Sequence, residues 1–363
     1  MAAKKKKGNR IFGITSRVLM LIVAGCLILS YGSVFVNPAK AWGLSLLGLM
    51  FVPFSIANLL LLLWAVKRRS GSFAIPLLAL LPSLFFLGRY VQVGSDDKVT
   101  ASDPTLKVVS YNVGRFTLYD QEYGIPGRRQ CADSIFTFLK EQDADIICLQ
   151  EFRIDNMANV RSYLNSKMKG YKAEFYLFPT ADGSAFGNVT LSRVPVRNKG
   201  KIKFEESANL AIYTDYEVHD RRFRVYNCHF ESYNISLPGI TRGLLHADKE
   251  LISKTGVKVK RSITRRPKQV DKVLSDIENC PVEAFVCGDF NDNPMSYTYY
   301  RMTKGRKDSF RETGHGFGAT FAHLWPMLRI DYILLPDRFR AVTHETPRIN
   351  YSDHYPVIAT IEL

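Results

Sequence analysis

Acidic residues are missing from the first quarter of this 363-residue chain. Residues 1–95 contain no Asp or Glu, although the whole chain has 34 of them. The same region carries 11 of the 49 basic residues, so it supplies most of the formal net charge of +15, and the remainder carries only +4. The basic balance of the whole chain therefore says little about nucleic-acid binding by the rest of the protein.

Cysteine is also scarce, with six residues, and the chain has no clustered set of Cys and His ligands. This pattern disfavours a zinc site. Cys148, Cys228 and Cys287 lie in apolar runs and are expected to be small buried residues. A single disulfide, for example one that uses Cys280, stays open because the compartment decides whether it forms. The chain has no internal repeat or low-complexity tract.

Three long apolar stretches fill the acid-free region, at about 14–36, 41–66 and 73–93. Each is close to the roughly 20 residues that a helix needs to cross a bilayer, so we expect a membrane domain of about three transmembrane helices. The alternative is a cleaved signal peptide followed by buried core helices, which the repeated absence of acidic residues disfavours. The third span is the least secure, because two prolines and an arginine lie in or near it.

Basic residues cluster before the first span and between the second and third, at Lys4–Lys7, Arg10 and Lys67–Arg69. Such clusters stay on the cytoplasmic side. Three crossings would then place the C-terminal domain in the periplasm or outside the cell, in a multi-pass protein of the bacterial inner membrane. If the third stretch does not span, the domain would be cytoplasmic.

We therefore expect the chain to divide into a membrane anchor at 1–95, a polar linker at 96–104 and a separate C-terminal domain at 105–363. The segment 237–266 is interpreted as a long basic loop that either grips a polyanionic substrate, lies against anionic lipid or is simply solvated. Periodicity predicts an α/β domain. Strands are expected at 108–113, 146–151, 173–178, 188–192, 210–218, 222–230, 284–290, 329–335 and 355–362, and helices at 128–142 and 267–278.

Polar side chains follow or interrupt several of these apolar runs. Asp331, for example, lies inside Arg329-Ile330-Asp331-Tyr332-Ile333-Leu334, where an unpaired carboxylate would cost several kcal/mol of desolvation. Repeated intrusions of this kind indicate a shared polar site at the ends of buried strands. In chain order the set is Asn112, Glu151, His229, Asp289, Asn291, Asp331, Asp353 and His354.

This ordered set, with Gly288-Asp289-Phe290-Asn291 and Ser352-Asp353-His354 as its most telling parts, resembles the endonuclease/exonuclease/phosphatase superfamily, the metal-dependent phosphoesterases related to deoxyribonuclease I. The resemblance covers about residues 105–363. It implies a four-layer α/β/β/α sandwich and the hydrolysis of phosphate esters.

Glu151 is the best candidate metal ligand. Carboxylate and amide oxygens favour Mg²⁺ or Mn²⁺ over zinc. The resemblance implies that Asn112 completes the metal environment and that Asp353 contributes there directly or through water. One metal ion is expected, and a second is left open near Asp289.

His354 is the candidate general base, and Asp331 is expected to accept its other ring proton and so fix the tautomer. The resemblance implies that His229 binds the scissile phosphate and donates toward the leaving group. For the remaining histidines the structural interpretation is preferred. They are His219, His246, His315, His323 and His344.

The resemblance further implies that Asp289 orients or deprotonates the nucleophile and that Asn291 donates to a phosphoryl oxygen. Asn188 either touches phosphate or is structural. Several aromatic residues near the motifs either stack on a base or sugar or pack in the core, and packing is preferred for most of them. They are Phe116, Tyr119, Tyr123, Tyr233, Phe317, Phe321 and Trp325.

These observations favour a membrane-anchored, Mg²⁺-dependent phosphodiesterase, and a nuclease in particular. The first alternative is a lipid-directed phosphodiesterase of the sphingomyelinase kind, or a phosphatase. The second is a binding module that has lost turnover, which the complete motif set disfavours. The expected partners are a phosphodiester substrate, nucleic acid before phospholipid, and the membrane itself, with no obligate protein partner evident.

Overall fold

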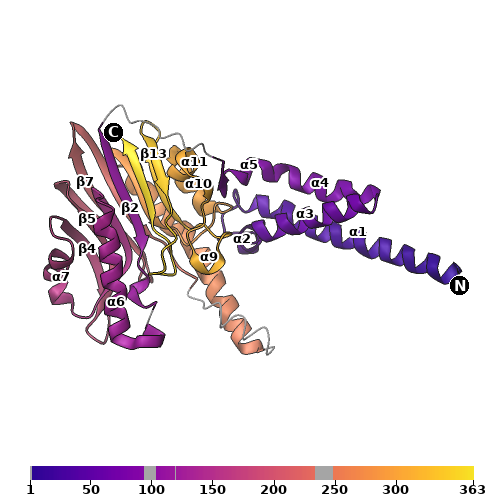
Figure 1. Cartoon of the computed structure of the whole chain (residues 1–363), viewed down its shortest axis with the longest axis horizontal. Helices are drawn as coiled ribbons and strands as arrows, with labels where there is room; N and C mark the ends of the chain where they lie inside the picture. The colour runs from indigo at the N-terminus through magenta and orange to yellow at the C-terminus, as the bar shows by residue number, and fades with distance from the viewer. Residues whose placement is uncertain (1, 94–103, 119, 234–247) are drawn as a thin grey trace. The chain divides into compact units, whose positions relative to one another are not determined.

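The structure is a computed structural model of the whole chain, shown in Figure 1. It divides into two compact units. The first combines Met1–Gly88 with Asn293–Tyr300 and is helical, and the second combines Arg89–Asp292 with Arg301–Leu363 and contains two large sheets. The structure describes every residue except 1, 94–103, 119 and 234–247.

One helix of the helical unit is long and apolar enough to cross a membrane. It is the segment Ile14–Gly32 of α1 (Ala2–Gly32), and it carries the first of the three expected spans. The remaining helical elements are shorter. They are α2 (Trp42–Leu49), α3 (Phe51–Lys67), α4 (Ala74–Leu80) and α5 (Leu84–Leu87), with 3₁₀ turns at Gly71–Phe73 and Leu81–Ser83.

The second expected span, 41–66, is broken. Helices α2 and α3 meet at Met50 with a bend of 59°, and only together do they reach the length and hydropathy of a span. Pro53 explains the break, because it lacks the N–H that a continuous helix would donate to the carbonyl of Leu49. The third stretch is a shorter apolar segment, Gly71–Leu87, which is interrupted by the 3₁₀ turn that contains Pro82.

Residues 293–300 belong to the helical unit, although the chain on both sides belongs to the other unit. The Asn293 side-chain amide donates to the Gly48 carbonyl at 3.0 Å, and the Ser33 hydroxyl donates to the Met295 carbonyl at 2.6 Å. A Cβ on Gly48 would collide with both Ser33 and Met295. Glycine at position 48 is what allows this close approach.

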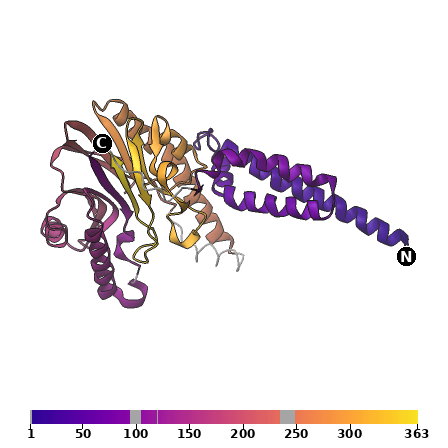
Figure 2. The same ribbon diagram turned by 45° about the horizontal axis from the view of Figure 1, so that its top comes forward.

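Two six-stranded sheets form the core of the second unit (Figures 1 and 2). The first sheet has the order β13-β14-β2-β3-β5-β4, and the second has the order β10-β12-β9-β8-β7-β6. In each sheet one central pair is parallel, β2 with β3 and β8 with β9, and the other pairs are antiparallel. A small third sheet pairs β1 (Val91–Gln92) with β11 (Gly316–Phe317).

Each of the two large sheets contains strands from both halves of the second unit's sequence. The first sheet comprises β2 (Thr105–Asn112), β3 (Ile146–Ile154), β4 (Lys172–Pro179), β5 (Ala185–Ser192), β13 (Arg340–Glu345) and β14 (Val357–Glu362). The second comprises β6 (Val196–Lys203), β7 (Leu210–Val218), β8 (Arg221–His229), β9 (Glu283–Asp289), β10 (Arg306–Asp308) and β12 (Asp331–Pro336).

Alternation along the strands separates two apolar layers. Val108 and Ile146 point between the two sheets, where they pack with Phe223 and Phe285 of the second sheet. Their neighbours Val109 and Ile147 point the other way, into a second cluster under α6 (Asp120–Glu141) and α7 (Val160–Lys167). Successive strand side chains face opposite sides of a sheet, so one apolar run supplies both layers.

The long helix α9 (Lys249–Glu278) covers the outer face of the second sheet. Asp276 of this helix accepts a hydrogen bond from the Tyr226 hydroxyl at 2.6 Å, and Tyr226 alternates with the inward-facing Val225. With α6 and α7 on the other side, the architecture is an α/β fold of two packed mixed sheets between helical layers, consistent with the expected sandwich. The short helix α11 (Ser309–Thr313) completes the unit, whereas α10 (Tyr297–Thr303) begins in residues that belong to the helical unit.

The expected basic loop at 237–266 is wrong in its described part. Helix α9 begins at Lys249 and runs through Pro267 without a break, so the helix predicted at 267–278 is its C-terminal part. Asp248 caps this helix by accepting from the Leu251 N–H at 3.0 Å. Residues 237–247 lie outside the described part of the chain.

All six cysteines are free thiols in the structure, including Cys280, for which a disulfide was left open. Cys148, Cys228 and Cys287 are buried in strands, as expected. Burial raises the pKa of the Cys228 thiol, which keeps it neutral and unreactive.

Candidate functional site

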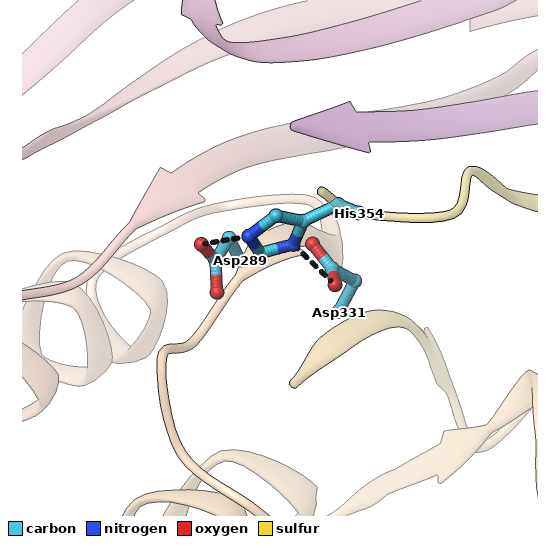
Figure 3. A group of neighbouring side chains, drawn as sticks. All are labelled: Asp289, Asp331 and His354. Carbon is cyan, nitrogen blue, oxygen red and sulfur yellow. Dashed lines mark hydrogen bonds and ion pairs between the residues drawn. The ribbon is translucent and has the colours of Figure 1, made fainter. Parts of the chain in front are cut away.

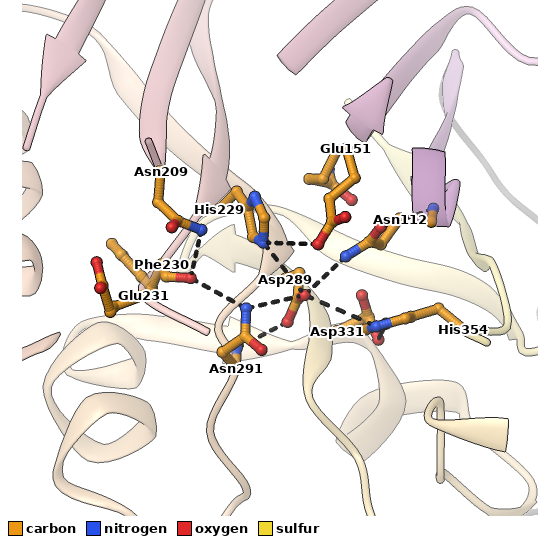
Figure 4. Close-up of polar contacts among 12 residues, drawn as sticks. Asn112, Glu151, Asn209, His229, Phe230, Glu231, Asp289, Asn291, Asp331 and His354 are labelled. Carbon is orange, nitrogen blue, oxygen red and sulfur yellow. Dashed lines mark hydrogen bonds and ion pairs between the residues drawn. The ribbon is translucent and has the colours of Figure 1, made fainter. Parts of the chain in front are cut away.

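Strand ends from both sheets meet at one site. In the second sheet, Asp289 at the end of β9 lies opposite His229 at the end of β8 and opposite Asp331 at the start of β12. In the first sheet, Asn112 ends β2 opposite Gln150 of β3, and β14 begins beside β2. The parallel and antiparallel pairing therefore brings the polar residues of distant segments to a common edge (Figure 4).

Asp289 lies at the centre of this arrangement and is 1% exposed. Its Oδ2 accepts from the Asn112 amide at 2.9 Å and from the Asn291 amide at 3.0 Å, and its Oδ1 accepts from the Asn291 backbone N–H at 2.7 Å. Gly288 lets β9 approach β8 here: its φ is +136°, and a Cβ would collide with the Cys228 carbonyl oxygen. The glycine of the Gly288–Asn291 motif is thus required by the backbone.

His354 and Asp331 form a buried pair. The Nδ1 atom of His354 lies 2.9 Å from Oδ2 of Asp331, while its Nε2 atom faces Oδ2 of Asp289 at 3.9 Å (Figure 3). The Ser352 hydroxyl accepts from the His354 backbone N–H at 3.2 Å and so fixes the turn that carries the imidazole. This is the geometry expected for a histidine whose tautomer is set by a carboxylate.

A β-bulge aims Glu151 into the site. The register of β3 against β5 shifts between Leu149 and Phe152, and Glu151 has a φ of +51°, which few non-glycine residues adopt. Its Oε1 lies 3.6 Å from Nε2 of His229, and its Oε2 pairs with Nε of Arg115 at 3.1 Å. Strained backbone of this kind is frequent at functional sites.

His229 presents an unpartnered nitrogen between two carboxylates. Its Nε2 atom is buried, forms no hydrogen bond with the described residues, and lies 3.6 Å from Glu151 and 3.7 Å from Asp289. A buried donor or acceptor without a partner costs about 1–3 kcal/mol. The position therefore suits a ligand atom that completes the set.

Burial and mutual repulsion shift the charges in the site. Burial raises the pKa of Asp289 to about 7, and the nearby carboxylate of Asp331 adds to the rise. Burial opposes a charge on His354, but Asp331 and Asp289 outweigh it and raise the pKa of the imidazole well above its ordinary value. Burial lowers the pKa of His229, so this imidazole is neutral at pH 7. Perturbed titration of clustered groups is typical of catalytic sites.

Comparison with known proteins agrees with this geometry. Residues 109–354 match the endonuclease/exonuclease/phosphatase family. The chain belongs to that family. It is therefore a hydrolytic phosphoesterase, of a family that generally depends on divalent metal ions. Residues 9–90 match a family described only as a domain of unknown function. A comparison with curated proteins found no match.

Solved structures share the fold of this phosphoesterase at low sequence identity. The endonuclease/exonuclease/phosphatase from Beutenbergia cavernae is 18% identical, with a TM-score of 0.53 over 71% of this chain and 72% of that one. The human Nocturnin catalytic domain with bound sulfate is 17% identical, with a TM-score of 0.53 over 72% and 95%. Zebrafish (D. rerio) TDP2 with a single-strand DNA product is 17% identical, with a TM-score of 0.50 over 72% and 100%.

Asn291 and Asn188, two candidates for phosphate contact, donate hydrogen bonds to backbone carbonyls of the protein. Both hydrogens of the Asn291 amide are used within the protein, by Asp289 and by the Phe230 carbonyl at 3.0 Å, so the expected donation to a phosphoryl oxygen would require one of these bonds to open. Asn188 donates to the backbone carbonyls of Asn227 and Leu210, at 3.0 and 3.3 Å, which links the two sheets. Its side-chain oxygen is buried without a partner among the described residues.

Asn112 and Asp353, which were expected to assist Glu151 in metal binding, have different surroundings. Asn112 contacts Asp289, while its side-chain oxygen accepts from the Gly114 N–H at 3.0 Å. Asp353 lies against the turn at Gly114 and accepts from Ser352 at 3.3 Å. Among the described residues, the His, Cys, Asp and Glu side chains that group closely enough to hold a cation are Asp289, Asp331 and His354, within 4.8 Å of one another.

Sequence reasoning missed two residues that shape the site. The Thr320 hydroxyl accepts from the backbone N–H groups of Ile330 and Asp331, at 3.0 and 3.1 Å, and fixes the start of β12. Arg115 has a φ of +57° and lies over the Phe186 ring at 4.4 Å while it pairs with Glu151. Neither lies in a motif, so only the fold reveals them.

The aromatic candidates separate into distinct environments. Phe116 is buried in the core, as preferred, whereas Phe321 packs edge-on against the His354 ring with centroids 5.4 Å apart. Phe317 and Trp325 are exposed, and their rings pack edge to face with centroids 5.9 Å apart. Tyr119 lies outside the described residues, as does His246, and the side chain of Tyr123 is not described.

Proposed function

We propose that this protein is a membrane-anchored, Mg²⁺-dependent phosphodiesterase whose substrate is nucleic acid. One observation carries the catalytic part of the proposal: the His354–Asp331 pair, Asp289, His229 and Glu151 converge at one edge of the two sheets. That set offers a base, an orienting carboxylate, a phosphate contact and a metal ligand within a few ångströms.

Glu151, assisted by Asn112 and Asp353, would hold the metal ion. The donor set fits: these side chains offer oxygen atoms, and the unpartnered Nε2 of His229 lies between the carboxylates of Glu151 and Asp289. Oxygen donors of this kind suit Mg²⁺ or Mn²⁺. When bound, such an ion neutralises charge that develops on the phosphoryl oxygens. Asp289, Asp331 and His354 also group closely enough to hold a cation, but in this proposal Asp331 and His354 act as the base and its partner and not as metal ligands.

The side chains divide the remaining work. His354, with Asp331 on its Nδ1, takes the proton from the attacking water at Nε2, and Asp289 orients that water. The water oxygen bonds to phosphorus as the bond to the leaving oxygen breaks. His229 donates toward the phosphate and the leaving oxygen, and Asn291 holds Asp289 in place.

The test is hydrolysis by the full-length purified chain with and without Mg²⁺. The panel contains single-stranded and duplex DNA, RNA, bis(p-nitrophenyl) phosphate, inositol phosphates and sphingomyelin vesicles. We expect Mg²⁺-dependent cleavage of nucleic acid and of the small diester. Selective cleavage of sphingomyelin would transfer the proposal to a lipid phosphodiesterase, and inactivity on every substrate would contradict it.

The anchor is proposed to be a multi-pass domain of the inner membrane, with the catalytic unit on the periplasmic or extracellular side. Ile14–Gly32 supports one crossing, and α2 with α3 supports a second only as a bent pair. The basic clusters at Lys4–Lys7 and Lys67–Arg69 support a cytoplasmic N-terminus. A reporter active only in the periplasm, fused to the C-terminus, is expected to be active. An inactive reporter, with an active cytoplasmic reporter at the same place, would reverse the orientation.

A further inference from the structure

A cavity of about 320 Å³ adjoins the catalytic residues on the side of Glu151 and His229. Its lining includes these two side chains, Phe186 and, from α9, the basic residues Lys258, Arg261 and Arg265. Nothing in the catalytic proposal uses the three basic residues. They place positive charge next to the catalytic residues of a phosphoesterase, where the substrate is negatively charged.

Buried contacts fix α9 against the end of β8. Arg266 is 1% exposed, and it donates to the Glu231 carbonyl and pairs with Asp292, at 3.1 and 3.0 Å. The Ser262 hydroxyl donates to the Ser232 carbonyl at 2.7 Å. Because these contacts involve the turn next to Lys258 and Arg261, the helix presents both cations at the cavity from a fixed backbone.

The charges around the cavity are not all balanced. Arg265 pairs with Glu206 at 2.5 Å, and Arg115 pairs with Glu151 at 3.1 Å. Lys258 and Arg261 are exposed, and within the described part of the chain no carboxylate forms an ion pair with either of them. Glu231 also lines the cavity, 3.6 Å from Arg265, so four basic residues face three acidic ones, and Lys258 and Arg261 are the two cations of the lining that have no ion-pair partner among the described residues.

This arrangement selects among phosphate esters. A headgroup of the sphingomyelin kind carries one phosphate and one quaternary ammonium group, and the cations would repel the latter. A nucleic-acid strand instead carries a further phosphate next to the scissile one, which two cations bind through charge-assisted hydrogen bonds. Phe186, which lies under Arg115, adds an aromatic surface beside the same cavity.

We infer that Lys258 and Arg261 form a subsite for a second phosphate group of a nucleic-acid strand, adjacent to the phosphate that is cleaved. The inference rests on the proposed function and narrows its substrate class. It makes the basic face of α9 a determinant of substrate choice and of substrate affinity, separate from the groups that perform the chemistry.

The test compares two variants of the full-length chain on two substrates. K258A/R261A removes the subsite, and K249A/K260A removes the same charge from positions of α9 that do not line the cavity. A single-stranded ten-residue oligonucleotide has neighbouring phosphates, whereas bis(p-nitrophenyl) phosphate has only one. Steady-state KM and kcat are measured for both across a range of salt concentrations.

For the oligonucleotide, K258A/R261A is expected to raise KM about tenfold with little change in kcat. The slope of log KM against log salt should fall by about 0.7, the value for one phosphate contact on a single strand. The effect on the small diester should be at least fivefold smaller, and K249A/K260A should not reproduce the pattern. An equal KM increase in both variants would overturn the subsite, although the proposed function would stand. Inactivity of the wild-type chain on both substrates would overturn the function and the subsite together.

Discussion

Replacing His354 with alanine is expected to lower kcat for Mg²⁺-dependent diester hydrolysis by about 10²–10⁴-fold, the usual contribution of a general base. The reason is geometric: Nε2 of His354 faces Asp289, and Nδ1 is already committed to Asp331 at 2.9 Å. The measurement is kcat on bis(p-nitrophenyl) phosphate, with circular dichroism to check the fold. His323→Ala is the matched control, because His323 is exposed and lies near the same aromatic cluster.

The pH profile adds a second readout. Asp331 helps to raise the pKa of His354, so Asp331→Asn should lower it. A base must lose its proton to work, so kcat/KM rises with pH through that pKa. In Asp331→Asn the rising limb should move to lower pH while the maximal rate falls, because the tautomer is no longer fixed. Full activity of His354→Ala, or an unmoved limb in Asp331→Asn, would contradict the assigned base.

Replacing Glu151 with glutamine is expected to weaken Mg²⁺ binding by on the order of 10²-fold and to lower kcat at least as much. Mutation of residues that only hydrogen-bond to a metal ligand already lowers metal affinity or activity by about 10–100-fold, so loss of a ligand should cost at least that. Metal binding is measured without turnover. At about 100 times its Kd, Mg²⁺ should stabilise the wild-type fold by about 2.7 kcal/mol, and most of this stabilisation should be lost in the variant.

The control for Glu151→Gln is Glu174→Gln. Glu174 has a similar side-chain exposure, 20% against 22%, and a similar ion pair, with Lys199 at 2.7 Å. Loss of the Glu151–Arg115 pair alone should cost little, because the Arg115 side chain is 41% exposed. Metal-induced stabilisation that survives in Glu151→Gln would move the metal site elsewhere, with Asp289, Asp331 and His354 as the next candidates.

The central strands were predictable because their sequences are continuous apolar runs that end in polar residues. Of the four edge strands, only β4 was predicted, whereas β6, β10 and β13 were not. Strand β6, whose sequence is Val-Arg-Asn-Lys-Gly-Lys-Ile-Lys, is largely exposed, and its lysines protect an unpaired edge while they hide the strand signal. Strand β13 is another edge that the apolar pattern missed. Helix α9 was divided at Pro267 because proline normally ends a helix.

In the functional site, too, some features were predictable from the sequence and others were not. Residue types and their order indicated which side chains carry chemistry, and the strand register explains why they meet. The bulge that turns Glu151, the bonds that occupy Asn291 and the inter-sheet contacts of Asn188 depend on atoms brought together from distant strands. No local pattern encodes such partners, so they follow only from the assembled sheets.

The helical unit is discontinuous, because residues 293–300 belong to it. The polypeptide passes between the units three times, after residues 88, 292 and 300, so a single cut would not separate them. Deleting residues 1–88 would leave the Asn293 amide and the Met295 carbonyl without Gly48 and Ser33. Removal of the helical unit by simple truncation would therefore leave the 293–300 segment without its packing partners, so a replacement for that segment has to be designed as well.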